Sequence, residues 1–136
     1  MSLEDSAIQK FLDTKEVGVL ATVQADGAPL AMAMWFLHTP AALIMISVAE
    51  TQKVRNLRRD PRVSVVAEAV VEGQIRGVAV QGRAEFLPEG PERRALIERF
   101  HAKYRGLERL WNGKTMPANR VMFKIVPSRV RSWGLG

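Results

Sequence analysis

The sequence contains no cysteine, which excludes disulfide bonds and thiolate chemistry. Its only histidines, His38 and His101, lie far apart in the chain, and two imidazoles are too few for the usual zinc site. We therefore expect no metal centre. No apolar run reaches the roughly 20 residues that a membrane helix needs, and the first residues are acidic where a signal peptide is basic. We expect a cytoplasmic protein with no membrane partner.

Acidic residues are outnumbered, because 20 Lys and Arg stand against 14 Asp and Glu and give a net charge of +6. This charge favours an anionic partner, whether nucleic acid, an acidic lipid or a phosphorylated small molecule. Aromatic residues are scarce, at 7% of the chain. A nucleic-acid-binding barrel needs exposed aromatic side chains for base stacking as well as those in its core, so we expect no nucleic-acid partner.

The 136 residues suit a single domain, residues 1–136, with one core. Runs of β-branched and apolar residues, separated by turn residues, predict strands. The expected strands are residues 17–24, 29–37, 42–48, 62–71, 75–87, 121–126 and a short 130–133. The expected helices run from a cap at Ser2 to about Thr14, over residues 52–59 and over residues 91–104.

Turn residues punctuate this pattern. Asp26-Gly27 predicts a hairpin turn, because Asp-Gly accepts the positive φ that such turns require. Gly77 and Gly82 predict bends or bulges inside a long strand. Pro127-Ser128 is expected to end the strand that begins near residue 121, and residues 106–118 are expected to form a loop. His38 is expected in a turn.

Consecutive strands joined by tight turns indicate an antiparallel sheet, and a near-continuous run of them indicates a barrel. We expect a mainly β protein with a six- to seven-stranded antiparallel barrel and about three helices. Such short strands enclose a small core. Burial of a further face against a second copy would compensate, so we expect a homodimer.

The most informative segment joins the apolar strand 42–48 to the helix at 52–59. Thr51 is a suitable N-cap, and the unpaired N–H groups of a helix N-terminus favour an anion. Lys53 adds a full positive charge, which is worth more in a desolvated crevice than on an open face. These residues predict a phosphate cradle. The same residues also fit a plain helix cap followed by a solvated basic face.

Several motifs, in order and with similar spacing, resemble the FMN-binding split-barrel family that contains pyridoxamine phosphate oxidase and relatives that bind a deazaflavin coenzyme. The motifs are Gly18-Val-Leu-Ala-Thr-Val, Asp26-Gly-x-Pro29, Trp35-Phe36, Lys53-x-x-Asn56-Leu-x-x-Asp60-Pro61-Arg62 and Val80-x-Gly82. The resemblance covers nearly the whole chain. It implies a split β-barrel that is homodimeric, with the cofactor site at the dimer interface.

The resemblance also implies cofactor-binding residues, position by position. The strand around the flavin ring matches Met32, Ala33, Met34 and Trp35. The ribityl and phosphate positions match Ile46 and Ser47, and the phosphate-binding run matches Thr51, Gln52 and Lys53. A tryptophan that the family places near the flavin of the partner subunit matches Trp133. No residue is assigned a catalytic role.

This chain departs from the family pattern at three places. Gln52 stands where the family has an arginine, and Arg55 or Arg58 would have to supply the missing charge. Gly77 replaces a flavin-contacting glutamine. The sequence lacks the arginine- and histidine-bearing tail that grips pyridoxal in the oxidase, so we expect a different substrate.

The resemblance implies a flavin-dependent oxidoreductase that transfers hydride to or from a small molecule. FMN is the expected cofactor, with a deazaflavin coenzyme as the alternative. A carrier, sensor or haem-handling module without turnover also remains open. Three further residues are not assigned a function. Trp111 lies in the expected loop, where it would pack either as a lid over the site or at the dimer interface. His101 and Tyr104 are one helical turn apart and therefore share one face of the third helix.

Overall fold

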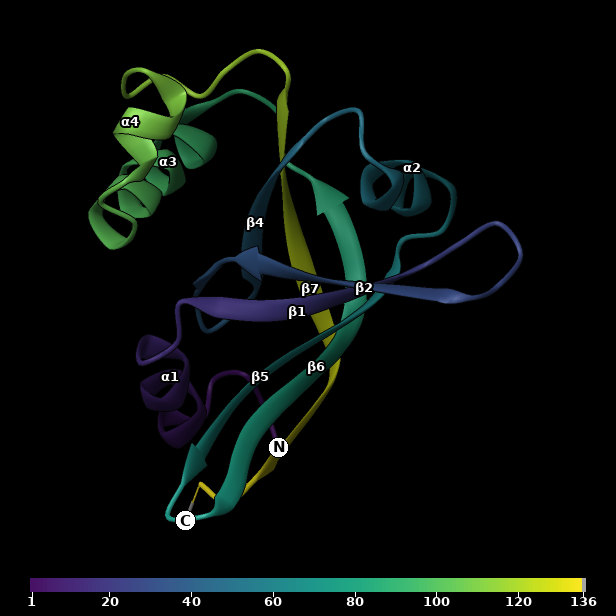
Figure 1. Cartoon of the computed structure of the whole chain (residues 1–136), viewed down its shortest axis with the longest axis vertical. Helices are drawn as coiled ribbons and strands as arrows, with labels where there is room; N and C mark the ends of the chain where they lie inside the picture. Colours follow the sequence, from purple (N-terminus) through teal and green to yellow (C-terminus); the bar gives the residue numbers. More distant parts are fainter. Residues whose placement is uncertain (136) are drawn as a thin grey trace.

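The computed structural model describes residues 1–135 and consists mostly of β-strands (Figure 1). The strands are β1 (Val17–Val23), β2 (Pro29–Trp35), β3 (Leu37–His38), β4 (Leu43–Val48), β5 (Arg62–Val71), β6 (Gln74–Phe86) and β7 (Arg120–Trp133). The helices are α1 (Ser6–Asp13), α2 (Gln52–Arg59), α3 (Pro91–Lys103) and α4 (Leu107–Trp111). The expected fold class is confirmed, with one helix more than predicted.

All seven strands belong to one antiparallel sheet in the order β2-β1-β5-β6-β7-β4-β3. The sheet curls, so that β1 and β2 cross the long strands β5, β6 and β7 (Figure 1). Strand β2, at one end of the order, returns to contact β4 near the other end. The sheet is therefore a split barrel, and its opening lies between β2 and β4.

The predicted turns form for the predicted reasons. Gly27 has a φ of 89°, and the Asp26 carboxylate accepts a hydrogen bond from the Ala28 N–H at 2.9 Å. Glu72 and Gly73 both have positive φ and join β5 directly to β6. These local turns set the strand registers on either side.

Strand β7 corrects one prediction, because Pro127-Ser128 does not end it. The register of the β6–β7 pair shifts there, with Gln81 opposite Arg129 but Gly82 opposite Pro127. A β-bulge therefore accommodates the proline within a continuous strand. A Cβ at Gly82 would lie 2.1 Å from the Val126 carbonyl oxygen, so only glycine fits this crossing.

Two helix predictions also need correction. Helix α1 begins at Ser6 after the N-cap Asp5, because Ser2 instead accepts a hydrogen bond from Glu4 N in a preceding turn. The expected loop 106–118 contains helix α4, which ends at Trp111 and is followed by the C-cap Asn112 in the left-handed conformation. Trp111 is 8% exposed and packs in the core under this helix.

The core has two parts. One fills the barrel and includes Phe36, Met45 and Phe123, each fully buried. The other lies between the outer face of the sheet and the α3–α4 pair, where Phe100 and Met122 are buried. The α3–α4 pair thus covers the β4 end of the sheet, at the end of the molecule opposite the β5–β6 hairpin tip (Figure 1).

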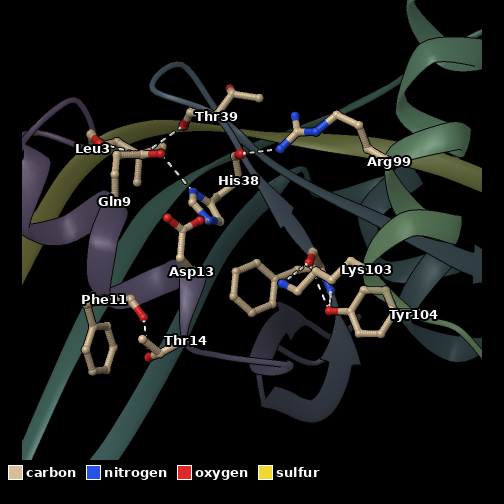
Figure 2. Close-up of polar contacts among 11 residues, drawn as sticks. Leu3, Gln9, Phe11, Asp13, Thr14, His38, Thr39, Arg99, Lys103 and Tyr104 are labelled. Atoms are coloured by element: carbon tan, nitrogen blue, oxygen red, sulfur yellow. Dashed lines mark hydrogen bonds and ion pairs between the residues drawn. The ribbon is translucent and has the colours of Figure 1, made fainter.

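A polar cluster joins α1, β3 and α3 (Figure 2). His38 lies in β3 and is 9% exposed, rather than in a turn; Nε2 lies 2.7 Å from Asp13 and Nδ1 lies 2.8 Å from Gln9 Oε1. Lys103 donates to the Phe36 carbonyl oxygen at 2.7 Å. Burial lowers the pKa of His38 and lowers the pKa of Lys103 to about 8.

Within residues 1–135, no helix has the length and apolar content required to cross a membrane. In the same described part of the chain, no three His, Cys, Asp or Glu side chains gather as a metal site would require.

Candidate functional site

A pocket of about 350 Å³ opens where the barrel is split, between β2 and β4. Strands β2 and β4 form its floor, α2 and the start of β7 form one end, and α3 and α4 form the other. The residues that line it are Ala33, Met34, Trp35, Ile46, Ser47, Val48, Lys53, Phe100, Leu107, Leu110, Trp111 and Arg120.

The polar end of this pocket is built by Ser47, Lys53 and Arg120, which we call the basic corner. Lys53 lies in the first turn of α2, where Thr51 caps the helix by accepting a hydrogen bond from Val54 N at 3.4 Å. Because a cap satisfies only part of the first turn, backbone N–H groups remain directed outward beside Lys53. The corner therefore combines helix-terminus donors with two full positive charges.

Lys53 is a partly buried cation with no anionic partner among the described residues. Burial lowers its pKa, which means that the ammonium has lost part of its hydration. Among the described residues, no carboxylate forms an ion pair with it and no acceptor takes a hydrogen bond from it. A desolvated charge is costly unless it is paired, so an anionic group of a ligand would stabilise it.

The opposite end is an apolar wall, defined as Trp35, Phe100, Leu107, Leu110 and Trp111. Leu110 is 64% exposed although it faces the pocket. The wall can bury one face of a flat, largely apolar ring system, which is the usual composition of a ligand pocket. The site thus suits a ligand with an anionic end and a planar body.

Tyr104 holds the wall in place. Its ring stacks on Trp35 with centroids 4.4 Å apart and planes 8° apart. The Tyr104 hydroxyl accepts from Phe36 N at 2.9 Å and lies 2.6 Å from the Glu16 carbonyl oxygen, to which it donates. These bonds fix the chain directly after β2, and with it the position of Trp35.

The structure gathers six of the ten predicted cofactor-binding residues around this one pocket. They are Ala33, Met34, Trp35, Ile46, Ser47 and Lys53. Met32 lies on β2 and is 39% exposed, and Thr51 caps α2. Neither residue lines the pocket. The cofactor roles of all ten remain predictions.

Gln52 turns away from the pocket. Its Nε2 donates to Asn56 Oδ1 at 2.8 Å, and its Oε1 accepts from Arg55 at 3.2 Å. The guanidinium of Arg58 lies 4.4 Å from the ring centroid of Phe86. Neither Arg55 nor Arg58 lines the pocket, because each contacts another side chain. Neither therefore supplies the positive charge that is missing at Gln52.

Trp133 lies near the C-terminal end of β7, whereas Arg120 at the pocket lies at its N-terminal end. A strand rises about 3.3 Å per residue, so the two ends of this long strand are far apart. Trp133 pairs with Gly77, and a Cβ at Gly77 would lie 2.3 Å from the indole. Trp133 therefore lies away from the pocket of its own chain, and its role at a cofactor stays a prediction.

Sequence reasoning missed Phe100, Arg120, Leu107 and Leu110 as pocket residues, and it named Trp111 only as a loop residue. Leu107, Leu110 and Trp111 carry a helical spacing that would have revealed α4. The flanking Gly106 and Asn112-Gly113 instead favoured a loop. For Arg120 no local signal exists, because its proximity to Lys53 depends on the pairing of β7 with β4.

Solved structures of the same architecture span nearly the whole chain. A conserved hypothetical protein from Mycobacterium tuberculosis is 32% identical over 99% of this chain and 86% of its own, with a TM-score of 0.78. A FAD-binding protein from Mesorhizobium loti is 26% identical over 91% of this chain and 87% of its own, with a TM-score of 0.74.

Two further relatives differ in the cofactor that their names state. An F420 reductase is 26% identical over 85% of this chain and 88% of its own, with a TM-score of 0.62. A heme storage protein from Vibrio cholerae covers 96% of this chain and 94% of its own with a TM-score of 0.77, but at 18% identity that likeness shows the fold alone.

The family model described as pyridoxamine 5'-phosphate oxidase matches residues 5–134. That match includes every strand, the α2 cap and the basic corner. On the length of this match and the split-barrel architecture, the chain belongs to the pyridoxamine 5'-phosphate oxidase family.

Proposed function

We propose that this protein is a flavin-dependent oxidoreductase that binds FMN in the pocket between β2 and β4 and acts on a small-molecule substrate. One observation carries the proposal. The pocket combines a partly desolvated, unpaired Lys53 at one end with the apolar wall at the other. FMN has the matching chemistry, with a phosphate at one end and a flat tricyclic ring at the other.

The basic corner binds the phosphate in this proposal. Lys53 supplies charge, Ser47 supplies a hydroxyl at the floor, and the capped N-terminus of α2 supplies backbone donors. The hydroxyl of Ser47 now donates to the Val48 carbonyl oxygen at 3.1 Å. Rotation about the Cβ–Oγ bond would let the same hydroxyl donate to a phosphate oxygen instead.

Strand β2 orients the ring. It stands at one end of the sheet order, so its outward backbone groups have no strand partner among residues 1–135. Such an edge offers N–H and C=O groups to the polar rim of a flavin. Met34 and Trp35 lie at the pocket side of this strand.

The bound flavin supplies the hydride chemistry, and the protein supplies binding, orientation and charge. The apolar wall excludes water from one face of the ring. Among the described residues that line the pocket, none pairs a nucleophile with a general base, and the proposed reaction requires no such pair.

We also propose that the working form is a homodimer. Trp133 lies away from the pocket of its own chain, and the resemblance to the family implies that this tryptophan lies near the flavin of the partner subunit. Exposed apolar side chains support a second copy: Val17 and Val19 on β1 are 42% and 37% exposed, and Trp35 opposite Val17 is 40% exposed. Covering this face would bury apolar area that is otherwise in contact with water.

The test is a titration of purified protein with FMN, followed by visible absorbance and flavin fluorescence, with mass spectrometry of any co-purified molecule. We expect FMN to bind, and Lys53→Ala to weaken binding roughly ten- to a hundredfold through loss of a charge-assisted contact. Lys10→Ala on the exposed face of α1 is the matched control and should bind as the wild type does.

Three results would contradict the proposal: no FMN binding, equal affinity in Lys53→Ala, or a cofactor-loaded protein that turns over no electron donor or acceptor. Parallel titration with coenzyme F420, a deazaflavin, tests the alternative that the F420 reductase relative supports. Tighter binding of F420 than of FMN would move the assignment to a deazaflavin-dependent reductase. Binding without turnover would identify a carrier or sensor.

A further inference from the structure

Two cations from distant parts of the chain meet at the basic corner. Lys53 comes from the first turn of α2, and Arg120 is the first residue of β7. The β4–β7 ladder brings them together, because Arg120 pairs with Val48, which ends β4 just before α2 begins. The position of Arg120 is therefore fixed by the sheet rather than by a flexible loop.

The arginines of α2 do not compete for this role. Arg55 donates to Gln52, and Arg58 stacks over Phe86. Arg59 donates to the Val23 carbonyl oxygen on β1. None of the three lines the pocket, and Arg120 is the one arginine that lines it within residues 1–135.

The Arg120 side chain is already oriented. One terminal nitrogen, NH1, donates to Asn119 Oδ1 at 2.7 Å, and the Arg120 backbone N donates to the Pro117 carbonyl oxygen at 3.1 Å. The other terminal nitrogen and Nε donate to no acceptor in the described chain. A guanidinium edge with two parallel N–H groups matches two oxygens of a phosphate.

We infer that Arg120 is a phosphate-binding residue that acts with Lys53 and supplies the charge that the family's arginine would supply at Gln52. This inference rests on the proposed function and extends it to ligand class. Two cations around one phosphate match a terminal phosphate monoester, which carries a charge of about −1.5 to −2 at neutral pH. A phosphodiester or a phosphate-free flavin carries less charge at this position and gains less from the pair.

The experiment compares FMN with riboflavin, which has the same ring and ribityl chain but no phosphate. Affinities are measured by quenching of flavin fluorescence for the wild type, Arg120→Met and Arg55→Met. Arg120→Met should weaken FMN binding roughly ten- to a hundredfold and leave riboflavin binding unchanged. Arg55→Met, which removes the same charge from outside the pocket, should bind FMN almost as the wild type does.

A pH series adds a second readout. Phosphate monoesters lose their second proton near pH 6, so the advantage of FMN over riboflavin should grow between about pH 5 and 7 in the wild type. Arg120→Met should show a smaller growth over the same range. Circular dichroism and thermal unfolding of each variant confirm that the fold is intact before titration.

The outcomes distinguish a failure of the proposed function from a failure of the role inferred for Arg120. If the wild type binds neither flavin, the proposed function and this inference both fail. If the wild type binds FMN and Arg120→Met binds it equally well, the inference alone fails. Equal losses for FMN and riboflavin would show that Arg120 shapes the pocket without contacting phosphate, and that result would also overturn it.

Discussion

Asn56 on α2 donates a hydrogen bond from Nδ2 to Thr22 Oγ1 on β1 at 3.0 Å, and the two side chains are 0% and 1% exposed. Asn56 Oδ1 in turn accepts from Gln52 Nε2 at 2.8 Å. This buried contact ties the short α2 helix to the barrel. Because Lys53 lies on the same helix, the contact also sets where its ammonium enters the pocket.

We predict that Asn56→Ala lowers the free energy of unfolding by about 1–3 kcal/mol, because it leaves the Thr22 hydroxyl buried without its partner. Flavin binding should weaken as α2 loosens. Chemical denaturation measures the loss. The double variant with Thr22→Val should lose less than the sum of the two single variants, and full additivity would show that the contact contributes nothing.

The ionisation of Tyr104 can be followed by ultraviolet absorbance without interference from other tyrosines, because it is the single tyrosine of the chain. Tyr104 stacks on Trp35 of the apolar wall, so its ionisation reports on that part of the pocket. Burial raises its pKa to about 12, against an ordinary value of about 10. We predict that ultraviolet absorbance of the ionised phenol appears near pH 12 in the folded protein and near pH 10 after denaturation. A folded-state midpoint near 10 would show that the hydroxyl is exposed.

The same shift affects stability at high pH. Between about pH 10 and 12 the unfolded chain has released the phenolic proton and the folded chain still holds it. The unfolded state then binds fewer protons, so the stability contributed by Tyr104 is complete below pH 10 and is lost as the pH rises through 12. Tyr104→Phe should remove this part of the decline, and an unchanged decline would contradict it.

Gly82 marks the crossing at which β7 passes its bulge. A Cβ there would lie 2.1 Å from the Val126 carbonyl oxygen, which is backbone and cannot rotate away. We predict that Gly82→Ala destabilises the protein by about 1–3 kcal/mol or more, because it forces β6 and β7 apart. Gly106→Ala is the control, since a Cβ at that position would have open space around it, with no atom of a more distant residue of the described chain within 4 Å.

The proposed dimer makes a complementation prediction. If each site takes Lys53 from one subunit and Trp133 from its partner, then Lys53→Ala and Trp133→Leu homodimers should both bind FMN poorly. A mixed dimer of the two variants restores one intact site. We expect co-expressed, doubly tagged heterodimers to bind about one FMN with wild-type affinity, as counted by titration. A heterodimer no better than its parents would show that both residues do not serve one interfacial site.

Local chemistry made much of this fold predictable. The Asp26-Gly27 turn, the Thr51 cap and the buried strand β4 all appear where the sequence indicated. Each depends on residues that are close together in the chain, through φ preferences, side-chain capping and hydrophobic periodicity. The helix N-terminus at Thr51 already indicated Lys53 as a phosphate ligand, resemblance to a family added the β2 strand as a site candidate, and both line one pocket in the structure.

Contacts between distant segments were beyond such reasoning. The proline in β7 read as a strand end, because the bulge that tolerates it is defined by pairing with Gly82 on another strand. His38 read as a turn residue, because its partners Asp13 and Gln9 come from α1. Each error came from a local signal that a tertiary contact overrode.

The sequence by itself thus determined most of the strands, the Asp26-Gly27 turn and the Thr51 cap of the helix that carries Lys53. Only the tertiary structure decided that Arg120 joins Lys53, that α4 completes the apolar wall and that Trp133 lies away from the pocket of its own chain. The physical reason is that these relations depend on strand register and on how the sheet curls. Register and curl are set by the packing of the whole core and not by any one segment.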